Sequence, residues 1–412
     1  MDVLQNLEGI ENIMIYVSDS LRWDFTPKKI LDMGLSFKTI ASSLYTASSF
    51  PSMVNGLYPP KHGVDTWEDK LSKGNRGLLE VSGYNISFRC ETTWVSMGPE
   101  DSQVHRVFGK PSGKKLEDLK EPFIYLEDDK GGHCPYGFSF EEYDGDCDDF
   151  FKEYGKKDRK KLIEKYSESI SESTKNFKKR LKTIEEMGIE DNTLVVFTSD
   201  HGELLGEYGG LAGHGKPPCP ELVYVPTVFI HPTIDQNTIE DNIIRHVDLF
   251  PTLMNIIGKK LDRKVDGVDL SHETPKVGMS FKKGGFLKKE GQKLKKFVSY
   301  KTNSIWDHDG GHVFHDMNNL PRRIFDWYKI SFQDTGYRYL TEQNKKHNWV
   351  KRISNYRKAL DHLTKRHIEY GSSSLKKEVA REILNHYLDE AEKYEERDKL
   401  NRAIEQVNID GV

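Results

Sequence analysis

The sequence predicts an α/β fold: a mostly parallel sheet flanked by helices, followed by a smaller C-terminal subdomain and a helical tail. Short apolar runs such as residues 12–17 and 193–198 have the length and composition of buried strands. Amphipathic helical patterns alternate with these runs, as expected when helices cover both faces of a parallel sheet. After about residue 270 this alternation stops, and basic or short β-like segments replace it.

The expected elements follow in chain order. The first strand, 12–17, ends in polar residues that include Asp19. Residues 39–63 are expected to form a loop, a short helix beginning near Pro51 and a Gly/Pro-rich exit. Apolar residues between 159 and 187 recur mostly at three, four or seven positions, which predicts a long amphipathic helix closed by Gly188. The remaining elements are strands at 84–88, 123–126, 193–198 and 223–230, and a helix over 249–257.

The C-terminal third is expected to divide at about residue 345. We predict three ranges: a large domain over 1–270, an α+β subdomain over 271–345 and a charged helical region over 346–412. Residues 282–296 are basic and contain glycine, which predicts a solvated hairpin or loop. An apolar stripe from Leu375 to Tyr394 predicts a helix that packs on the core, with Ser374 as its N-cap. The turn-like segment 307–316 is expected to be a polar hairpin tip.

Composition and charge exclude several classes of protein. Aromatic residues make up 11% of the 412 residues, which argues against disorder. Lys and Arg number 61 and Asp and Glu 65, so the net charge of −4 provides no global attraction for nucleic acid or anionic membranes. No apolar run is long enough to span a bilayer, no signal-peptide pattern is present, and the four cysteines lack paired spacing. We therefore expect a cytoplasmic, reduced protein without a nucleic-acid partner or a membrane span.

Two carboxylates and a histidine are expected to meet at one edge of the sheet. Asp19 follows the first strand, and Asp200 and His201 follow the strand at 193–198. Open α/β sheets place their sites at the carboxyl ends of the strands. These ligand types suit a divalent metal such as Mn²⁺, Zn²⁺, Ca²⁺ or Mg²⁺. Ser49 lies in a hydroxyl-rich run before Pro51, so we expect it at a helix N-terminus, where an anion or a developing alkoxide is favoured.

Each of these features also has a simpler structural explanation. An aspartate after a strand often caps a helix or forms a turn, and a Ser/Thr-rich loop before a proline often caps a helix. It is the combination, in this order, that favours a site. His62 is predicted to be a structural turn residue, and His246 to cap a helix or to bond near the site without a direct catalytic role.

Three blocks of the sequence resemble hallmark motifs of the sulfatase family, in the alkaline phosphatase superfamily. They are Ile13-Met-Ile-Tyr-Val-Ser-Asp19-Ser-Leu-Arg22, Ser49-Phe-Pro51-Ser52 with Asn55-Gly and Lys61-His62-Gly63, and Asn192-Thr-Leu-Val-Val-Phe-Thr-Ser-Asp200-His201-Gly202-Glu203. With shorter similar pieces they cover roughly residues 10–270. The resemblance implies an alkaline phosphatase/sulfatase-like, metal-dependent catalytic domain over 1–270. It implies metal ligation by Asp19, Ser49, Asp200 and His201, a nucleophilic Ser49, and substrate-binding or catalytic roles for His133, His214 and Lys216.

Departures from the family pattern bear on the substrate. The sulfatase nucleophile is a formylglycine made from Cys or Ser in a C/S-x-P-S-R motif, whereas here Met53 replaces the arginine. Ser20 stands where the family has a second aspartate. Unmodified hydroxyl nucleophiles are typical of phosphoester- and phosphonate-processing relatives. The sequence therefore favours hydrolysis of a phosphate or phosphonate ester of a small molecule or sugar. The alternatives are a sulfatase with modified Ser49, a phospho-group transferase and an inactive binding homologue.

Overall fold

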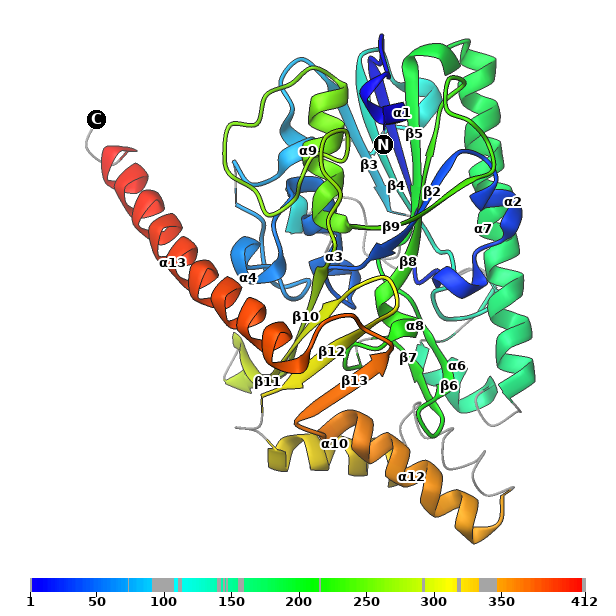
Figure 1. The fold of residues 1–412 in the computed structure, drawn as a ribbon, viewed down its shortest axis with the longest axis vertical. Coiled ribbons are helices and arrows are strands. Elements are labelled where there is room, and N and C mark those ends of the chain that lie inside the picture. The colour runs from blue at the N-terminus through cyan, green and yellow to red at the C-terminus, as the bar shows by residue number, and fades with distance from the viewer. Residues whose placement is uncertain are drawn as a thin grey trace.

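The computed structural model describes residues 2–72, 74–90, 107–109, 113–138, 142–143, 145, 147–154, 159–214, 216–290, 293–316, 320–332 and 347–409. A large sheet flanked by helices forms the main body, and a smaller sheet, with helices of its own, adjoins one end of it (Figure 1). For residues 284–290 and 293–300 only the backbone is described. The α/β fold class and the smaller C-terminal part are as the sequence predicts.

The large sheet has seven strands in the order β3-β4-β1-β5-β8-β2-β9. Strand β1 pairs in parallel with both β4 and β5, and among the described strands of this sheet β8 alone runs antiparallel to its neighbours. The mostly parallel sheet is therefore confirmed. Its strands are β1 (Asn12–Ser18), β2 (Leu35–Ile40), β3 (Asn85–Cys90), β4 (Phe123–Asp129), β5 (Thr193–Thr198), β8 (Tyr224–Ile230) and β9 (Thr238–Arg245).

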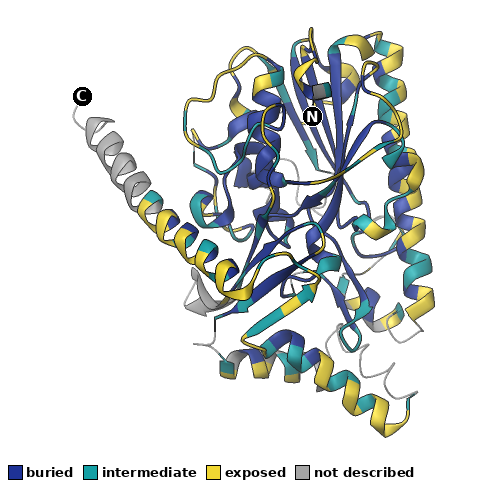
Figure 2. Ribbon diagram, in the orientation of Figure 1, coloured by how far each residue is buried: buried dark blue, intermediate teal, exposed yellow. Residues whose placement is uncertain are grey.

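Helices cover both faces of this sheet, so its central strands are apolar throughout. Every residue of β1 and β5 is buried (Figure 2). Alternate β1 side chains point to opposite faces: Ile13 and Ile15 join one core with helices α3 (Thr46–Asn55) and α9 (His246–Ile256). Met14 and Tyr16 join the other core with the long helix α7 (Arg159–Met187). Continuous apolar runs are the expected pattern for strands covered on two faces.

The smaller sheet is antiparallel and has the order β10-β11-β12-β13. Its strands are β10 (Gly278–Glu290), β11 (Lys293–Trp306), β12 (Gly310–His315) and β13 (His367–Gly371). The predicted hairpin at 282–296 is therefore β10 and β11, although residues 291–292 at its centre lie outside the described residues. Strand β13 lies within the range for which we expected only charged helices. Its residues alternate in polarity (His-Ile-Glu-Tyr), but the segment is only five residues long and lies between two charged helical stretches, which dominated the expectation.

Among the described residues, the helices that accompany the small sheet are α10 (Leu320–Phe332), α12 (Trp349–Thr364) and α13 (Lys377–Ile409). Ser374 does not cap α13, because its N–H and hydroxyl both donate to the carboxylate of Asp307. The shorter elements are α1 (Asp2–Gln5), η1 (Trp23–Phe25), α2 (Lys28–Leu31), α4 (Pro59–His62), η2 (Gly77–Glu80), η4 (Leu116–Asp118), α6 (Cys147–Tyr154), η5 (Glu190–Asn192), β6 (Leu204–Glu207), β7 (Leu211–Gly213) and α8 (Pro220–Val223). Within the described residues, no helix combines the length and apolar character needed to cross a membrane.

The helix expected near Pro51 begins five residues earlier than predicted. Helix α3 starts at Thr46, and the N–H groups of Ser48 and Ser49 both donate to the carbonyl of Tyr45 at 3.0 Å. Pro51 therefore lies inside the helix, where it lacks one backbone donor. Gly56 ends the helix with a left-handed φ of 72°. The prediction took proline as a first-turn residue, but here the packing of the whole of α3 in the core outweighs that preference.

Candidate active site

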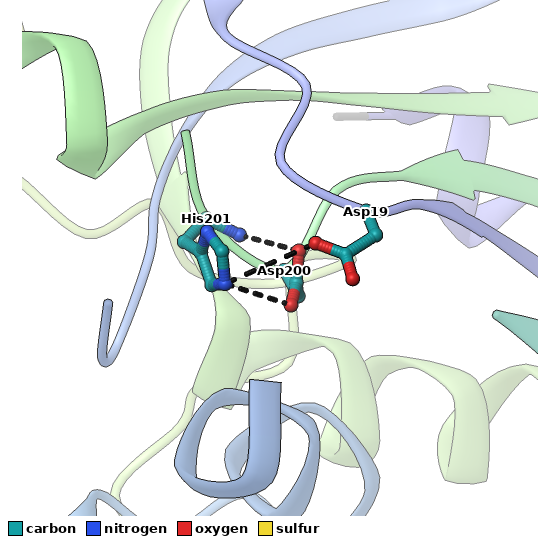
Figure 3. Close-up of side chains that lie close together, drawn as sticks. All are labelled: Asp19, Asp200 and His201. Atoms are coloured by element: carbon teal, nitrogen blue, oxygen red, sulfur yellow. Dashed lines mark hydrogen bonds and ion pairs between the residues drawn. The ribbon is translucent and has the colours of Figure 1, made fainter. Parts of the chain in front are cut away.

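Asp19, Asp200 and His201 meet at the carboxyl end of the sheet, as predicted (Figure 3). Val17 of β1 pairs with Thr198 of β5, so the residues that follow these two strands emerge side by side. The Nε2 atom of His201 lies 3.3 Å from Oδ2 of Asp200 and 3.9 Å from Oδ1 of Asp19. One ligand atom from each side chain lies within 4.8 Å of the others, and all three side chains are buried.

The charges of this cluster are those of a cation site. Burial, together with the carboxylates of Asp200 and Asp128, raises the pKa of Asp19 well above its usual value. Burial lowers the pKa of His201, so its imidazole is neutral near pH 7. The buried Oδ2 atom of Asp200 accepts no hydrogen bond. Two adjacent buried carboxylates and a neutral imidazole leave negative charge uncompensated, so these side chains fit a divalent cation.

Thr46 presents its hydroxyl to this cluster. It is the first residue of α3, and its Oγ1 lies 3.4 Å from Nε2 of His201. Burial raises the pKa of Asp200, but the His201 ring, the Ser20 N–H and the Thr46 hydroxyl outweigh burial, and this pKa lies below its usual value. The first N–H groups of a helix have no carbonyl partner within the helix, so an anion is favoured beside Thr46.

Ser49 has different contacts from those predicted. Its hydroxyl donates to the main-chain oxygen of Asp200 at 2.6 Å and lies 3.1 Å from Nδ1 of His246. Nε2 of His246 in turn lies 2.9 Å from the main-chain oxygen of Ser199. Ser49 and His246 therefore hold the backbone that carries Asp200, and the contacts of Ser49 are not those of a metal-bound nucleophile. The predicted role of His246, bonded near the site, agrees with this arrangement.

The sequence analysis missed Thr46 because it started the helix at the wrong residue. Three hydroxyl residues, Thr46, Ser48 and Ser49, lie in the run before Pro51, and placing Pro51 in the first turn put Ser49 at the N-terminus of the helix. The residue that could have located the helix correctly lies at its C-terminal end. Gly56 is a typical C-cap, and a helix of average length that ends before it begins near Thr46.

His214 lies over the cluster and is oriented by a buried carboxylate. The His214 and His201 rings are 4.5 Å apart, centroid to centroid. Nδ1 of His214 lies 3.0 Å from Oε2 of Glu203, and the hydroxyl of Tyr136 donates to Oε1 of Glu203 at 2.9 Å. Burial raises the pKa of Glu203 to about 7 and lowers that of His214 to about 4. The sequence analysis quoted Glu203 in a motif but gave it no role.

The other predicted substrate-binding residues lie around His214. The His133 ring is 5.0 Å from the His214 ring, and burial lowers the pKa of His133 to about 3. Lys216 and Lys282 are near enough to His214 to contribute, after burial, to its lowered pKa. Lys282 comes from β10 of the small sheet, and its Nζ lies 5.2 Å from the centre of the Tyr45 ring. The site therefore combines a negative metal-binding cluster with nearby imidazole and ammonium groups.

Comparison with known proteins gives the family. Residues 116–259 match the family described as Sulfatase. The chain is 36% identical over 336 residues to the low-salt glycan biosynthesis sulfotransferase Agl7 of Haloferax volcanii, and the match covers 80% of this chain and 81% of that protein. The chain belongs to the sulfatase family. The family resemblance inferred from the three motif blocks is thus confirmed.

Solved structures share the fold of this sulfatase-family chain. The phosphonate monoester hydrolase of Agrobacterium radiobacter has a TM-score of 0.55 and 15% identity, and the match covers 74% of this chain and 87% of that one. A protein solved with its substrate D-glucosamine-2-N,6-O-disulfate also has a TM-score of 0.55 and 15% identity, with coverage of 84% and 98%. The chain is an ester-hydrolysing enzyme of the sulfatase/alkaline phosphatase superfamily.

Proposed function

We propose that this enzyme hydrolyses a phosphate or phosphonate ester of a sugar or another small alcohol, with Thr46 as the nucleophile. The observation that carries the proposal is the position of the Thr46 hydroxyl, 3.4 Å from His201 and facing the carboxylate of Asp200. This hydroxyl lies at a helix N-terminus beside a cation-binding cluster, where a developing alkoxide is favoured. Thr46 replaces Ser49 in the mechanism that the sequence suggested.

Asp19, Asp200 and His201, with the hydroxyl of Thr46, are the groups that would hold a divalent cation. A bound cation lowers the pKa of a coordinated hydroxyl and neutralises charge on the transferring group. The ligand types fit Mn²⁺ and Zn²⁺ at least as well as Ca²⁺ and Mg²⁺, because one of them is an imidazole nitrogen.

The residues around the cluster supply the other parts of the reaction. Thr46 gives its hydroxyl proton to the carboxylate of Asp200, with which it is hydrogen-bonded, as Oγ1 attacks phosphorus in line, forms the new O–P bond and breaks the bond to the leaving oxygen. Glu203 and His214 hold a proton between them, at 3.0 Å, which passes to the leaving oxygen. Water then attacks phosphorus and gives a proton back to the Glu203–His214 pair, while the bond to Thr46 breaks and Oγ1 regains its proton from Asp200, so that phosphate or phosphonate is released. His133 and the ammonium group of Lys216 stabilise negative charge on the transferring group.

An unmodified threonine favours phosphorus over sulfur in a hydrolase. A threonine hydroxyl that attacked sulfur would leave a sulfate ester on the enzyme. A formylglycine hydrate escapes from this state because its second hydroxyl can expel sulfate by C–O cleavage, and threonine has no second hydroxyl. A phosphothreonine needs no such group, because water can attack its phosphorus directly.

Transfer of a sulfuryl group to a sugar hydroxyl is a second candidate function. The specific observation in its favour is the 36% identity to a protein named as a glycan biosynthesis sulfotransferase. In a transferase an acceptor hydroxyl attacks sulfur in place of water and gives its proton to the Glu203–His214 pair. The S–O bond to Thr46 breaks, Oγ1 regains its proton from Asp200, and the sulfuryl group leaves with the acceptor. The same residues serve both reactions. An experiment must therefore distinguish phosphorus from sulfur in the transferred group, and water from a sugar hydroxyl as its acceptor.

The deciding experiment combines mass spectrometry with a substrate panel. The peptide that carries Thr46 and Ser49 is weighed first, and we expect both residues to be unmodified. Aryl phosphates, phosphonates and sulfates are then compared with and without added monosaccharides. We expect phosphate or phosphonate hydrolysis to exceed sulfate hydrolysis by about 10²-fold, which is about 2.7 kcal/mol of barrier. Sulfate turnover only in the presence of a sugar acceptor would support the transferase, and sulfate hydrolysis in water by unmodified enzyme would overturn the phosphate proposal.

A further inference from the structure

Strand β10 brings a lysine from the small sheet to the edge of the active site. The N–H of Phe281 donates to the carbonyl of Ser42 at 3.0 Å, and the hydroxyl of Ser43 donates to the carbonyl of Phe281 at 3.1 Å. The next residue of the strand is Lys282, and its Nζ atom lies 5.2 Å from the centre of the Tyr45 ring. The two hydrogen bonds therefore fix the backbone beside Lys282 against the segment that leads into helix α3.

The Tyr45 ring is a neighbour of both Lys282 and His214. Its centroid lies 6.4 Å from that of the His214 ring, and the two ring planes are 29° apart. Burial lowers the pKa of His214, Asp200 opposes this change, and the ammonium group of Lys282 adds to it. Lys282 is therefore close enough to act on a group that is bound at His214.

The metal-binding cluster and the residues around His214 have different exposure. The three side chains of the cluster are at most 1% exposed, whereas Tyr45, His214 and Lys282 are partly exposed. The transferring group lies at the buried cluster, so the alcohol part of the ester extends past His214 toward the partly exposed side, where Tyr45 and Lys282 lie. Within the described part of the chain, the Tyr45 hydroxyl makes no hydrogen bond, so it can donate one to a ligand.

We propose that Lys282 and the Tyr45 hydroxyl bind an anionic substituent on the alcohol part of the substrate. The substrate then carries two negative groups, the ester that is cleaved and a second group on the same sugar or small alcohol, such as a carboxylate or a sulfonate. An ammonium group donates up to three hydrogen bonds to an anion, and a phenol adds one. This inference rests on the proposed function, which places the alcohol part, and it names the substrate class.

The transferring group has other partners for its charge. In the proposed mechanism the metal-binding cluster, His133 and Lys216 surround it. Lys282 instead contacts the ring of Tyr45, which lies on the other side of the reaction from the cluster, beside the leaving oxygen. An ammonium group at this position is suited to a charge on the leaving alcohol.

The neighbouring Lys283 provides a matched control. Successive side chains of a strand point to opposite faces, and the Nζ atom of Lys283 forms an ion pair with Asp65 at 2.9 Å. Lys283→Met removes the same charge as Lys282→Met, one position further along β10. A general effect of positive charge on anionic substrates would therefore change in both variants, whereas the proposed contact is lost in Lys282→Met alone.

The test uses pairs of esters that differ by one negative charge: 3-carboxyphenyl and 3-carbamoylphenyl phosphate, and the corresponding sulfates. In the wild-type enzyme kcat/KM should be about tenfold or more higher for the carboxyphenyl ester, the effect of a hydrogen bond to a charged group. Lys282→Met should reduce this ratio to about one, Tyr45→Phe should reduce it by about threefold, and Lys283→Met should leave it unchanged. A 3-sulfophenyl ester shows whether a carboxylate or a sulfonate is preferred, and melting temperatures show that each variant is folded.

Calorimetric binding of the two leaving alcohols, 3-hydroxybenzoate and 3-hydroxybenzamide, gives a readout that needs no turnover. If no ester is hydrolysed, the proposed function fails, but tighter binding of hydroxybenzoate that is lost in Lys282→Met would still support the anionic subsite. Equal binding of the two alcohols would overturn it. An unchanged ester ratio in Lys282→Met, or an equal fall in Lys283→Met, would also overturn it. Equal loss for both esters in Lys282→Met would assign this lysine to the transferring group instead.

Discussion

The Thr46 hydroxyl lies 3.4 Å from Nε2 of His201, whereas the Ser49 hydroxyl, one turn further along the same helix, donates to the backbone of Asp200. The two hydroxyls therefore have different surroundings, and we propose different functions for them. One faces the side chains that can hold a cation, and the other fixes the loop from which those side chains project. If Thr46 is the nucleophile and Ser49 is structural, substitutions of the two residues should change turnover and stability to different extents.

Substitutions of Thr46 and Ser49 should affect turnover very differently. Thr46→Ala should lower kcat by about 10³-fold or more, because covalent catalysis is lost while the carboxylates and imidazoles remain. Ser49→Ala removes a buried hydrogen bond, so it should cost about 1–2 kcal/mol of unfolding free energy and lower kcat by about tenfold or less. Steady-state kinetics and urea denaturation of the purified variants measure both effects.

Thr46→Ser is the control for this comparison. It keeps a hydroxyl at the first position of α3 and should retain measurable turnover. If Ser49→Ala loses as much activity as Thr46→Ala is expected to lose, and Thr46→Ala remains active, then the original assignment of the nucleophile to Ser49 is the right one.

Metal binding should depend on Asp200. Its Oδ2 atom is buried without a hydrogen-bond donor. The carboxylate of Asp200 lies beside the carboxylate of Asp19 and the ring of His201. Asp200→Asn removes the negative charge but keeps the shape, so stoichiometric Mn²⁺ or Zn²⁺ should be lost while the chain stays folded. Elemental analysis after dialysis gives the result, with Asp307→Asn, remote from the cluster, as the control. Full occupancy in Asp200→Asn would remove this carboxylate from the ligands.

Glu203 should act through His214. Its Oε1 atom accepts a hydrogen bond from the Tyr136 hydroxyl, and its Oε2 atom lies 3.0 Å from Nδ1 of His214. Glu203→Gln keeps the size of the side chain but cannot share a proton with the imidazole, so kcat should fall by about 10²-fold with little change in KM. The loss should be smaller for substrates with acidic leaving groups such as nitrophenol, which need no proton. A loss of equal size for acidic and basic leaving groups would mean that Glu203 is structural only.

Much of the fold follows from the sequence because burial on two faces leaves a clear pattern. Strands β1 and β5 are buried at every position, and their apolar runs are visible without a structure. The polar residues after them, Asp19 and Asp200, then follow from the rule that sites lie at the carboxyl ends of parallel strands. For the same reason the long helix α7, with one buried face, was predicted within its observed bounds.

The rest depends on contacts that local pattern does not record. Strand β9 is half exposed, and its residues before Ile243 are mostly polar, so it has no apolar run. Helix α3 contains a proline that local rules place in the first turn, and only its packing in the core shows that the helix begins at Thr46. The contacts of Glu203 become visible only when Tyr136 and His214, distant in sequence, are brought to its two oxygens.

The last prediction concerns His62, which is buried and must stay neutral in the folded chain. Its Nδ1 accepts the N–H of Val64 at 3.1 Å, and its Nε2 lies 3.2 Å from the hydroxyl of Ser52. A proton on Nδ1 would face the Val64 N–H, and the structure agrees with the turn role predicted for this residue. Burial, with a contribution from Lys283, lowers the pKa of His62 to about 3.

Because this pKa is about 3 in the folded chain and about 6.5 in the unfolded chain, the unfolded state binds the additional proton between these values. Stability from His62 is therefore complete above pH 6.5 and is lost as the pH falls toward 3, by up to about 1.4 kcal/mol per pH unit. His62→Asn keeps an acceptor for Val64 and does not titrate, so its unfolding free energy should fall less steeply between pH 6.5 and about 4.5. Other buried histidines titrate in both proteins and cancel in the difference. Urea denaturation at several pH values measures the two slopes, and equal slopes would show that His62 is already protonated in the folded chain or that its pKa is not shifted.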